Sequence, residues 1–338
     1  AFAALLRRSG KPVVLAANKA EGRAGDIGIT EAYALGLGEP IALSAEHGEG
    51  MAELYAAIVA HERAPADPDA PKTARPINIA IIGRPNAGKS TLVNALIGED
   101  RLLVGPEAGI TRDSIAINWE WRGKQYRLVD TAGMRKKAKV QAKLERLSVG
   151  ETLHALKFAD VCVLVMDANE AFEKQDLSIG DLVVREGRAL VFCLAKWDTI
   201  ADPRAHFEEL KLVARESLPQ ARGAPIVTVA AQSGVGLDRL MKAVEEAHED
   251  WTARVKTKDL NDWLYATIAR HPPPAVRGRR IKPRYLTQIK ARPPTFVLIA
   301  SRAEDMPESY KRYLVNGLRD AFGLHAAPIR LMVKAGKN

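Results

Sequence analysis

The sequence GRPNAGKS, residues 83–90, matches the pattern G-x-x-x-x-G-K-[ST] of a phosphate-binding loop. Gly83 and Gly88 let the backbone curl so that successive N–H groups point inward, where they can hold phosphate oxygens at the start of a helix. Lys89 adds a positive charge against the β- and γ-phosphates, and the hydroxyl of Ser90 is a ligand for Mg²⁺. The spacing therefore predicts a nucleotide site with Mg²⁺, lined by Gly83, Arg84, Pro85, Asn86, Ala87, Gly88, Lys89, Ser90 and Thr91.

Two later polar segments occur in the order that nucleotide hydrolysis needs. Asp130 begins the sequence DTAG, where its carboxylate can hold Mg²⁺ through a water and the Gly133 backbone can turn toward a γ-phosphate. Thr111 lies in a polar loop between the two motifs, and its hydroxyl can reach the metal when that loop orders. We predict that Lys89, Thr111 and Gly133 are catalytic and that Ser90, Thr111 and Asp130 hold Mg²⁺. The same side of the site would include Thr131, Ala132 and Met134.

The segments that must position these residues alternate between strand-like apolar runs and helix-length amphipathic stretches. This alternation predicts an α/β fold with a mostly parallel sheet covered by helices. The apolar runs are residues 77–83, 126–130, 161–167, 189–195 and 225–231. Cys162 and Cys193 lie inside two of these runs without a C-x-x-C pattern, so we expect core thiols and a reducing, cytoplasmic setting.

The chain also contains an internal repeat. Residues 11–22 resemble residues 189–200, and residues 39–58 resemble residues 224–244, with the same Lys-containing loop after a strand and the same G-x-G before a helix. No phosphate loop precedes the first copy. We therefore expect residues 1–63 to be the trailing third of a first nucleotide-binding domain whose beginning is absent.

Charge is distributed unevenly along the chain. The whole chain has a net charge of +9, but residues 251–338 contain 18 Lys and Arg against 6 Asp and Glu, a net charge of +12, and the rest carries −3. This surplus favours an acidic partner such as nucleic acid, with a solubility feature as the alternative. The same segment reads helix, strand, strand, helix, strand.

Taken together, these motifs resemble the Der (EngA) family of tandem GTPases that act in ribosome assembly. The resemblance is carried by GRPNAGKS, Thr111, DTAG, AKWD at 195–198, the repeat, the Pro-rich linker and MRKK after DTAG. The resemblance implies that GTP and GDP are the ligands and that the large ribosomal subunit, with its rRNA, is the partner. Binding to a membrane or to DNA is not expected. The protein is expected to be a monomer. The implied divisions are a remnant of the first GTPase domain (1–63), a Pro-rich linker (64–76), a second GTPase domain (77–250), a KH-like α+β domain (251–334) and a tail (335–338).

In that family the sequence at the position of AKWD is NKxD, and this loop recognises guanine. Carried over, Asp198 would accept hydrogen bonds from guanine N1–H and the N2 amine, and the Lys196 stem would lie over the base; Trp197 belongs to the same loop. Ala195 stands where the family has Asn. Losing one or two neutral hydrogen bonds lowers affinity by about ten- to a hundredfold, so we expect weaker binding with guanine selectivity retained through Asp198.

The remaining base-site positions also depart from the family. The second base loop would be Ala230, Ala231 and Gln232, which lacks the family's Ser hydroxyl. In the first copy the corresponding residues are Asn18, Lys19, Glu21, Ser44 and Ala45, with Glu21 in place of Asp.

Met134 follows DTAG, where many GTPases have a Gln that orients the attacking water, so slow intrinsic hydrolysis is expected. In related GTPases with a hydrophobic residue there, a phosphate-loop Asn helps to bind K⁺. Asn86 occupies that position and is a candidate K⁺ ligand, with turn stabilisation as the alternative.

The basic end offers an RNA-binding candidate. Tyr285 adjoins a cluster of cations that could contact phosphates, Arg277, Arg279, Arg280, Lys282 and Arg284. KH modules clamp RNA with a GXXG loop, and residues 251–338 contain none. We therefore expect shape- and phosphate-based rRNA contact, or packing against the GTPase domains.

Two alternatives to a ribosome-assembly GTPase remain. Ala195, Ala230 and the incomplete first domain favour a nucleotide-impaired scaffold that binds RNA, whereas the joint presence of Lys89, Ser90, Thr111 and Asp130 opposes it. A membrane- or tRNA-modification GTPase is disfavoured, because no apolar run reaches the ~18 residues of a spanning helix and no further catalytic cluster occurs.

Overall fold

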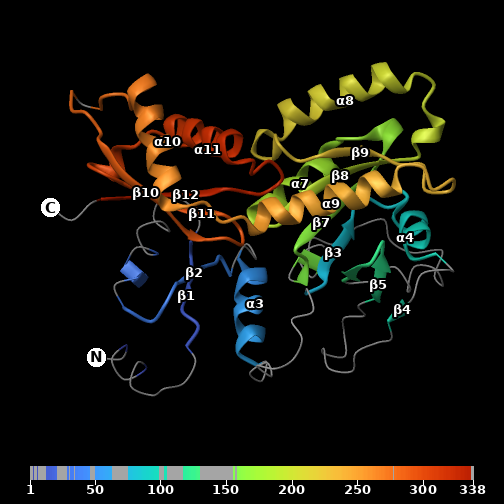
Figure 1. Cartoon of the computed structure of the whole chain (residues 1–338), viewed down its shortest axis with the longest axis horizontal. Coiled ribbons are helices and arrows are strands. Elements are labelled where there is room, and N and C mark those ends of the chain that lie inside the picture. Colours follow the sequence, from blue (N-terminus) through green and yellow to red (C-terminus); the bar gives the residue numbers. More distant parts are fainter. Residues whose placement is uncertain are drawn as a thin grey trace. The chain divides into compact units, whose positions relative to one another are not determined.

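The computed structural model describes residues 13–20, 35–45, 50–62, 75–98, 103–104, 117–129, 155–156, 158–276 and 278–335, together with residues 3, 6, 29 and 31–33. The chain forms two compact units, one of residues 1–85 and 97–159, the other of residues 86–96 and 160–338. Each unit is built around strands whose ends carry the predicted loops (Figure 1).

In the first unit, two short strands come from the first copy of the repeat. Strand β1 (Ala16–Ala17) pairs in parallel with β2 (Ile41–Ala42), and helix α3 (Met51–Glu62) follows. Gly50, just before α3, has a φ of 74°. A Cβ there would overlap the carbonyl oxygen of Ala42, so only glycine fits this turn.

The first unit has four further strands, of which β3 leads into the phosphate loop. Strand β3 (Ile77–Ile82) pairs in parallel with β6 (Lys124–Leu128), which forms an antiparallel hairpin with β5 (Ile117–Trp121); β4 (Leu103–Val104) pairs with β5. Arg122 and Gly123 both have positive φ, 49° and 80°, as a two-residue hairpin turn needs. The buried rings of Trp119 and Tyr126 stack with centroids 5.4 Å apart.

The second unit contains the last three of the five predicted strands. Strands β7 (Val161–Asp167), β8 (Ala189–Ala195) and β9 (Ile226–Thr228) pair in parallel and are surrounded by α7 (Lys174–Arg185), α8 (Pro203–Ser217) and α9 (Leu237–Thr252) (Figure 1). Every residue of β8 is buried, as expected for a strand covered on both faces. Cys162 and Cys193 are buried free thiols, which confirms the prediction for them.

The C-terminal part of the second unit has the predicted α-β-β-α-β order. It comprises α10 (Thr257–Arg270), β10 (Pro283–Lys290), β11 (Thr295–Ala300), α11 (Glu308–Phe322) and β12 (Arg330–Ala335). Strand β11 is central, antiparallel to β10 and parallel to β12. One apolar core, which includes Leu264, Phe296 and Leu318, joins both helices to the sheet.

Helix α10 covers the outer edge of β10. The side-chain amide of Asn261 accepts from Leu286 N and donates to Leu286 O, both over 2.9 Å. The hydroxyl of Tyr265 donates to the carbonyl of Arg284 over 2.9 Å. The helix thus supplies partners to strand groups that would otherwise be unpaired.

Trp251, at the end of α9, joins the two parts of the second unit. Its indole N–H donates to the carbonyl of Gly187 over 2.7 Å, and the guanidinium groups of Arg188 and Arg292 each lie 5.9 Å from its ring centroid. Backbone contacts add to this joint, because Leu190 N donates to the carbonyl of Ala326 over 3.3 Å.

Candidate nucleotide site

The phosphate loop connects β3 to helix α4 (Lys89–Ile97). Gly83, Asn86 and Gly88 have φ values of 144°, 61° and 99°, a backbone shape from which successive N–H groups can converge on an anion. The N–H of Leu92 donates to the carbonyl of Gly88 over 2.9 Å, so the helix begins directly after the loop. In its first turn Ser90 and Thr91 are exposed.

The first base loop follows the last residue of β8, Ala195. Lys196 has a left-handed backbone with φ of 57°, and the short 3₁₀ turn Trp197–Thr199 comes next. Asp198 is exposed, and its carboxylate has no hydrogen bond or ion pair within the described part of the chain. This carboxylate is therefore available to accept hydrogen bonds from a ligand.

The second base loop, Ala230–Gln232, is tied to the first by backbone hydrogen bonds. Trp197 N donates to Val229 O over 3.2 Å, and Val229 N donates to Leu194 O over 2.8 Å. Ala230 N donates to Val235 O over 2.9 Å and so closes the turn toward α9. The sequence-predicted residues 195–198 and 230–232 thus belong to one bonded group of loops.

The phosphate loop and the first base loop meet at Gly88 and Ala195, both in the second unit. A Cβ built on Gly88 would lie 3.3 Å from the Cβ of Ala195. Position 195 is buried, so a side chain here faces the phosphate loop rather than solvent. The structure therefore brings the phosphate loop, at Gly88, next to the start of the first base loop, at Ala195.

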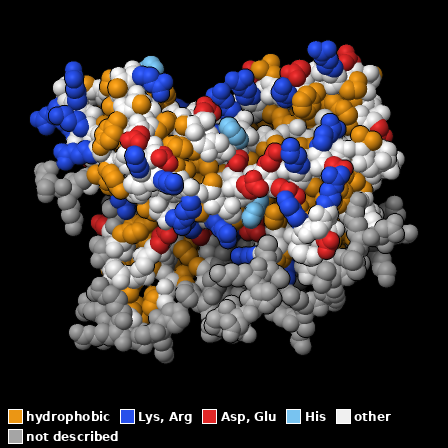
Figure 2. Space-filling view, in the orientation of Figure 1, with side chains coloured by type: hydrophobic (Ala, Val, Ile, Leu, Met, Phe, Trp, Pro, Cys, Tyr) orange, Lys and Arg blue, Asp and Glu red, His pale blue; other side chains and the backbone are white. Residues whose placement is uncertain are grey.

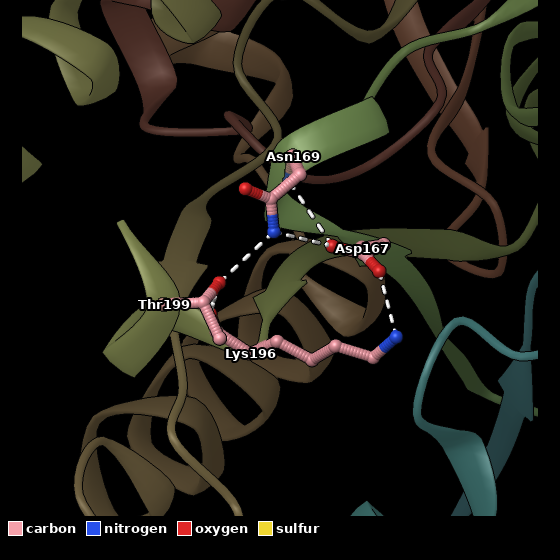
Figure 3. A network of polar contacts seen from close by, with 4 residues as sticks. All are labelled: Asp167, Asn169, Lys196 and Thr199. Carbon is pink, nitrogen blue, oxygen red and sulfur yellow. Dashed lines mark hydrogen bonds and ion pairs between the residues drawn. The ribbon is translucent and has the colours of Figure 1, made fainter. Parts of the chain in front are cut away.

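A polar network holds the base loop from the neighbouring strand (Figure 3). Asp167, the last residue of β7, is the register partner of Ala195. Its carboxylate accepts from Lys196 Nζ over 2.7 Å on one oxygen, and from the N–H and Nδ2 of Asn169, each over 3.0 Å, on the other. Asn169 Nδ2 also donates to Thr199 Oγ1 over 2.9 Å, and that hydroxyl donates to Lys196 O over 2.8 Å. Both ends of the loop are therefore held.

The Asp167 carboxylate that accepts from Lys196 has a lowered pKa. Burial would raise the pKa of Asp167, but hydrogen bonds from Lys196 and Asn169 and the positive charge of Lys196 outweigh it, so the pKa lies below the usual 3.8. Sequence inspection did not identify Asp167, Asn169 or Thr199. The available signal was an acidic residue at the carboxyl end of a buried parallel strand, the edge where such sheets bind ligands.

The first copy of the repeat shows how a base loop is held when Asn occupies the position that corresponds to Ala195. Asn18 Oδ1 accepts from Lys19 N over 2.9 Å and from Ala45 N over 3.0 Å, which ties its two loops together. Ser44 is buried beside them. Lys19 is left-handed with φ of 60°, like Lys196.

Several predicted site residues lie outside the described residues. They are Glu21, Thr111, Asp130, Thr131, Ala132, Gly133, Met134 and Arg277.

The described members of the RNA candidate extend from a small turn to the start of β10. Val276 and Arg279 exchange backbone hydrogen bonds of 3.0 and 3.1 Å, and Arg279, Arg280, Lys282 and Arg284 are exposed. The ring of Tyr285 is 45% exposed. Figure 2 shows Lys and Arg side chains gathered around this end of the C-terminal part.

Within the described residues, no helix has both the length and the apolar character needed to cross a membrane.

Comparison with known families matches both parts of the chain. Residues 78–196 match the family described as a 50S ribosome-binding GTPase, and residues 254–334 match the family described as the KH-domain-like, C-terminal region of EngA bacterial GTPase enzymes.

Curated relatives match along the whole chain. GTPase Der of Hyphomonas neptunium is 53% identical over an alignment of 389 positions, covering 100% of this chain and 76% of the relative. GTPase Der of Dinoroseobacter shibae is 56% identical over an alignment of 359 positions, covering 99% of this chain and 73% of the relative. Among solved structures, Era in complex with MgGDPNP and a segment of 16S ribosomal RNA has a TM-score of 0.37 at 19% identity, covering 77% of this chain and 93% of that chain.

Proposed function

Because this chain belongs to the Der (EngA) family of GTPases, we propose that it binds GTP and GDP, hydrolyses GTP slowly, and acts as a nucleotide-dependent switch in assembly of the large ribosomal subunit. The observation that carries the nucleotide part is the meeting of the phosphate loop and the base loop at Gly88 and Ala195. One ligand can then reach both the start of α4 and the carboxylate of Asp198.

Asp198 would give the site its preference for guanine. Guanine presents an N1–H and an N2 amine to a carboxylate, whereas adenine has no donor at N1 and no N2 amine. Ala195 supplies no side-chain hydrogen bond, so GDP affinity is about ten- to a hundredfold below that of the same chain with Asn at this position.

The proposed chemistry uses residues at the phosphate end. Lys89 would balance the charge of the β- and γ-phosphates, while Thr111 and Gly133 would orient the attacking water and the γ-phosphate. Mg²⁺ would supply positive charge to the phosphates, held by Ser90, Thr111 and, through a water, Asp130. The exposed position of Ser90 in the first turn of α4 supports this role.

Asn86 would hold K⁺ at the phosphates. Its exposed position in the loop, with a φ of 61°, leaves its side chain accessible there. Faster GTP hydrolysis in K⁺ than in Na⁺ at constant ionic strength supports the role, and equal rates refute it.

The proposed domains follow the element boundaries. Helix α3 ends at Glu62, β3 begins at Ile77 and α10 begins at Thr257, which supports a remnant of the first GTPase domain over 1–63, a linker over 64–76, a second GTPase domain over 77–250 and a KH-like domain over 251–334.

The exposed cations around Arg279 and Arg280 are the proposed rRNA contact, acting through phosphates.

Titration of GDP, ADP and xanthosine diphosphate with Mg²⁺ tests the nucleotide part. We expect measurable GDP binding without ADP binding, and tighter GDP binding in Ala195→Asn. Asp198→Asn should exchange GDP for xanthosine diphosphate, because an amide donates to the O2 of xanthine where a carboxylate accepts from the N2 amine of guanine. Binding of ADP as tight as that of GDP contradicts the proposal.

The second candidate is a nucleotide-impaired scaffold that binds RNA. It is favoured by the absence of a side-chain acceptor at Ala195, where the first copy has Asn18 with two hydrogen bonds. If GDP binds only after Ala195→Asn, while the unchanged chain still binds ribosomal subunits, the protein acts as a scaffold and not as a nucleotide-dependent switch.

A further inference from the structure

The two copies of the repeat build their base loops with the same backbone hydrogen bonds. In the first copy Ala20 N donates to Leu43 O over 3.0 Å, and Leu43 N donates to Ala17 O over 2.9 Å. The second copy repeats this pattern between Trp197 and Val229, and between Val229 and Leu194. The loops can therefore be compared position by position, with Ala195 in the place of Asn18.

The comparison shows what the second copy lacks. Asn18 Oδ1 accepts from the amides of Lys19 and Ala45, and so fixes the left-handed residue and the adjacent loop with one atom. The methyl group of Ala195 cannot accept a hydrogen bond. The second base loop must be held by other groups.

The network around Asp167 supplies them. Each side-chain proton of Asn169 and Thr199 has one acceptor: the two Nδ2 protons of Asn169 go to Asp167 and Thr199, and the Thr199 proton goes to Lys196 O. The loop between Lys196 and Thr199 is thus clamped at both ends to the end of β7. A further bond, from His206 Nε2 to Ala168 O over 2.7 Å, fixes the turn that carries Asn169 to α8.

We propose that Asp167 is a positioning residue for nucleotide binding, which holds Lys196 and the base loop in place of the side-chain acceptor that Ala195 lacks. The proposal rests on the proposed GDP site. The ion pair of 2.7 Å fixes the Lys196 ammonium, and the side chain of Lys196 stays 44% exposed, so its stem is open to a base. The register of Asp167 with Ala195 places the compensating group beside the altered position.

GDP affinity tests the proposal in four proteins: the unchanged chain, Asp167→Asn, Ala195→Asn and the double variant. We expect Asp167→Asn to weaken GDP binding about three- to tenfold when residue 195 is Ala, and less than about twofold when it is Asn. Asp181→Asn is the matched control, because Asp181 pairs with Arg185 at 2.8 Å on α7 without bonding the base loop, and its GDP affinity should be unchanged. An equal effect of Asp167→Asn in both backgrounds, or none, overturns the proposal.

A second cycle separates positioning from general stability. In a Lys196→Met background, Asp167→Asn should no longer change GDP affinity, because the ammonium it holds is gone. The thermal unfolding midpoints of Asp167→Asn and Asp181→Asn should be equal, because the effect of Asp167→Asn is on the base loop and not on general stability. If Asp167→Asn weakens GDP equally with and without the ammonium, Asp167 does not act through Lys196.

Amide hydrogen exchange of the nucleotide-free protein distinguishes failure of this proposal from failure of the GDP site. We expect faster exchange at residues 196–200 in Asp167→Asn and restored protection in the double variant with Ala195→Asn. Unchanged exchange overturns the positioning role even if GDP binds. Absence of GDP binding with the expected exchange pattern overturns the proposed function and leaves the loop clamp supported.

Discussion

A methyl group on Gly88 would lie 3.3 Å from the Cβ of Ala195, so the absence of a side chain at Gly88 leaves the space that a larger residue at position 195 would use. Gly88 therefore meets two requirements, a positive φ of 99° and room for the residue across from it. The need for room across from residue 195 couples the phosphate loop to the base loop.

Gly88→Ala and Ala195→Asn should conflict. Gly88→Ala alone forces an alanine into the left-handed region, at a cost of about 1–2 kcal/mol. Combined with Ala195→Asn, the free energy of unfolding should fall by about 1–3 kcal/mol more than the two single changes predict, because both side chains need the same space. Urea unfolding of all four proteins measures this coupling. If the losses of the two single variants add up to that of the double variant, the two side chains do not compete for the same space.

Gly236→Ala should damage the second base loop more than Gly234→Ala. Both glycines have positive φ, 91° and 75°, so both substitutions carry the same backbone strain. Only at Gly236 would a Cβ overlap the carbonyl oxygen of Thr228, whereas at Gly234 the nearest atom is Leu237 Cδ1 at 4.0 Å. We expect Gly236→Ala to cost about 1–3 kcal/mol more in unfolding free energy and to weaken GDP binding further. Denaturant titration with parallel GDP titration measures both, and equal losses would contradict the steric account.

The two buried thiols should make the protein less stable in alkali. Burial raises the pKa of Cys162 and of Cys193 from 9.0 to about 12. As pH rises above 9, thiols of the unfolded chain lose protons that the folded chain keeps, so each thiol should lower the unfolding free energy by about 1 kcal/mol between pH 9 and pH 10. Urea unfolding at these two pH values should show a smaller decrease in the Cys162→Ala/Cys193→Ala protein. An unchanged decrease would mean that the thiols ionise alike in both states.

Gly187→Ala should loosen the joint around Trp251. Gly187 has a φ of 73°, and a Cβ there would lie 2.9 Å from Pro293 Cγ. Gly323, at the end of α11, has a φ of 67° with no atom within 4 Å of a Cβ, so Gly323→Ala is a control with the same backbone strain and no collision. Gly187→Ala should cost about 1–3 kcal/mol more than the control. Loss of Trp251 burial should accompany it, seen as a red shift in tryptophan emission against the control variant.

The sequence predicts best those features that lie within one continuous segment. The phosphate loop, AKWD and the α-β-β-α-β order each follow from local spacing and alternation, and the order agrees with the structure. The hairpin of β5 and β6 was not predicted, although Arg122 and Gly123 occupy its turn. An Arg-Gly pair is a weaker hairpin signal than Asn-Gly, because arginine adopts positive φ less readily.

Features that depend on the register between distant strands could not be predicted. Asp167 and Lys196 are 29 residues apart in sequence, and their pairing follows only from the alignment of β7 with β8. The role of Trp251 depends likewise on which loop reaches the end of α9. Neither relationship has a local pattern, so an isolated Asp or Trp gives no sign of it.

The two hydrogen bonds between Asn261 and Leu286, one in each direction, let one side-chain amide imitate a neighbouring strand. A second chain, or an extended peptide, that approached β10 would have to displace Asn261 and Tyr265 before it could bond to the strand. This edge is thereby protected against strand addition and the aggregation that follows from it. Substituting Asn261 would remove that protection without touching any residue of the candidate nucleotide site.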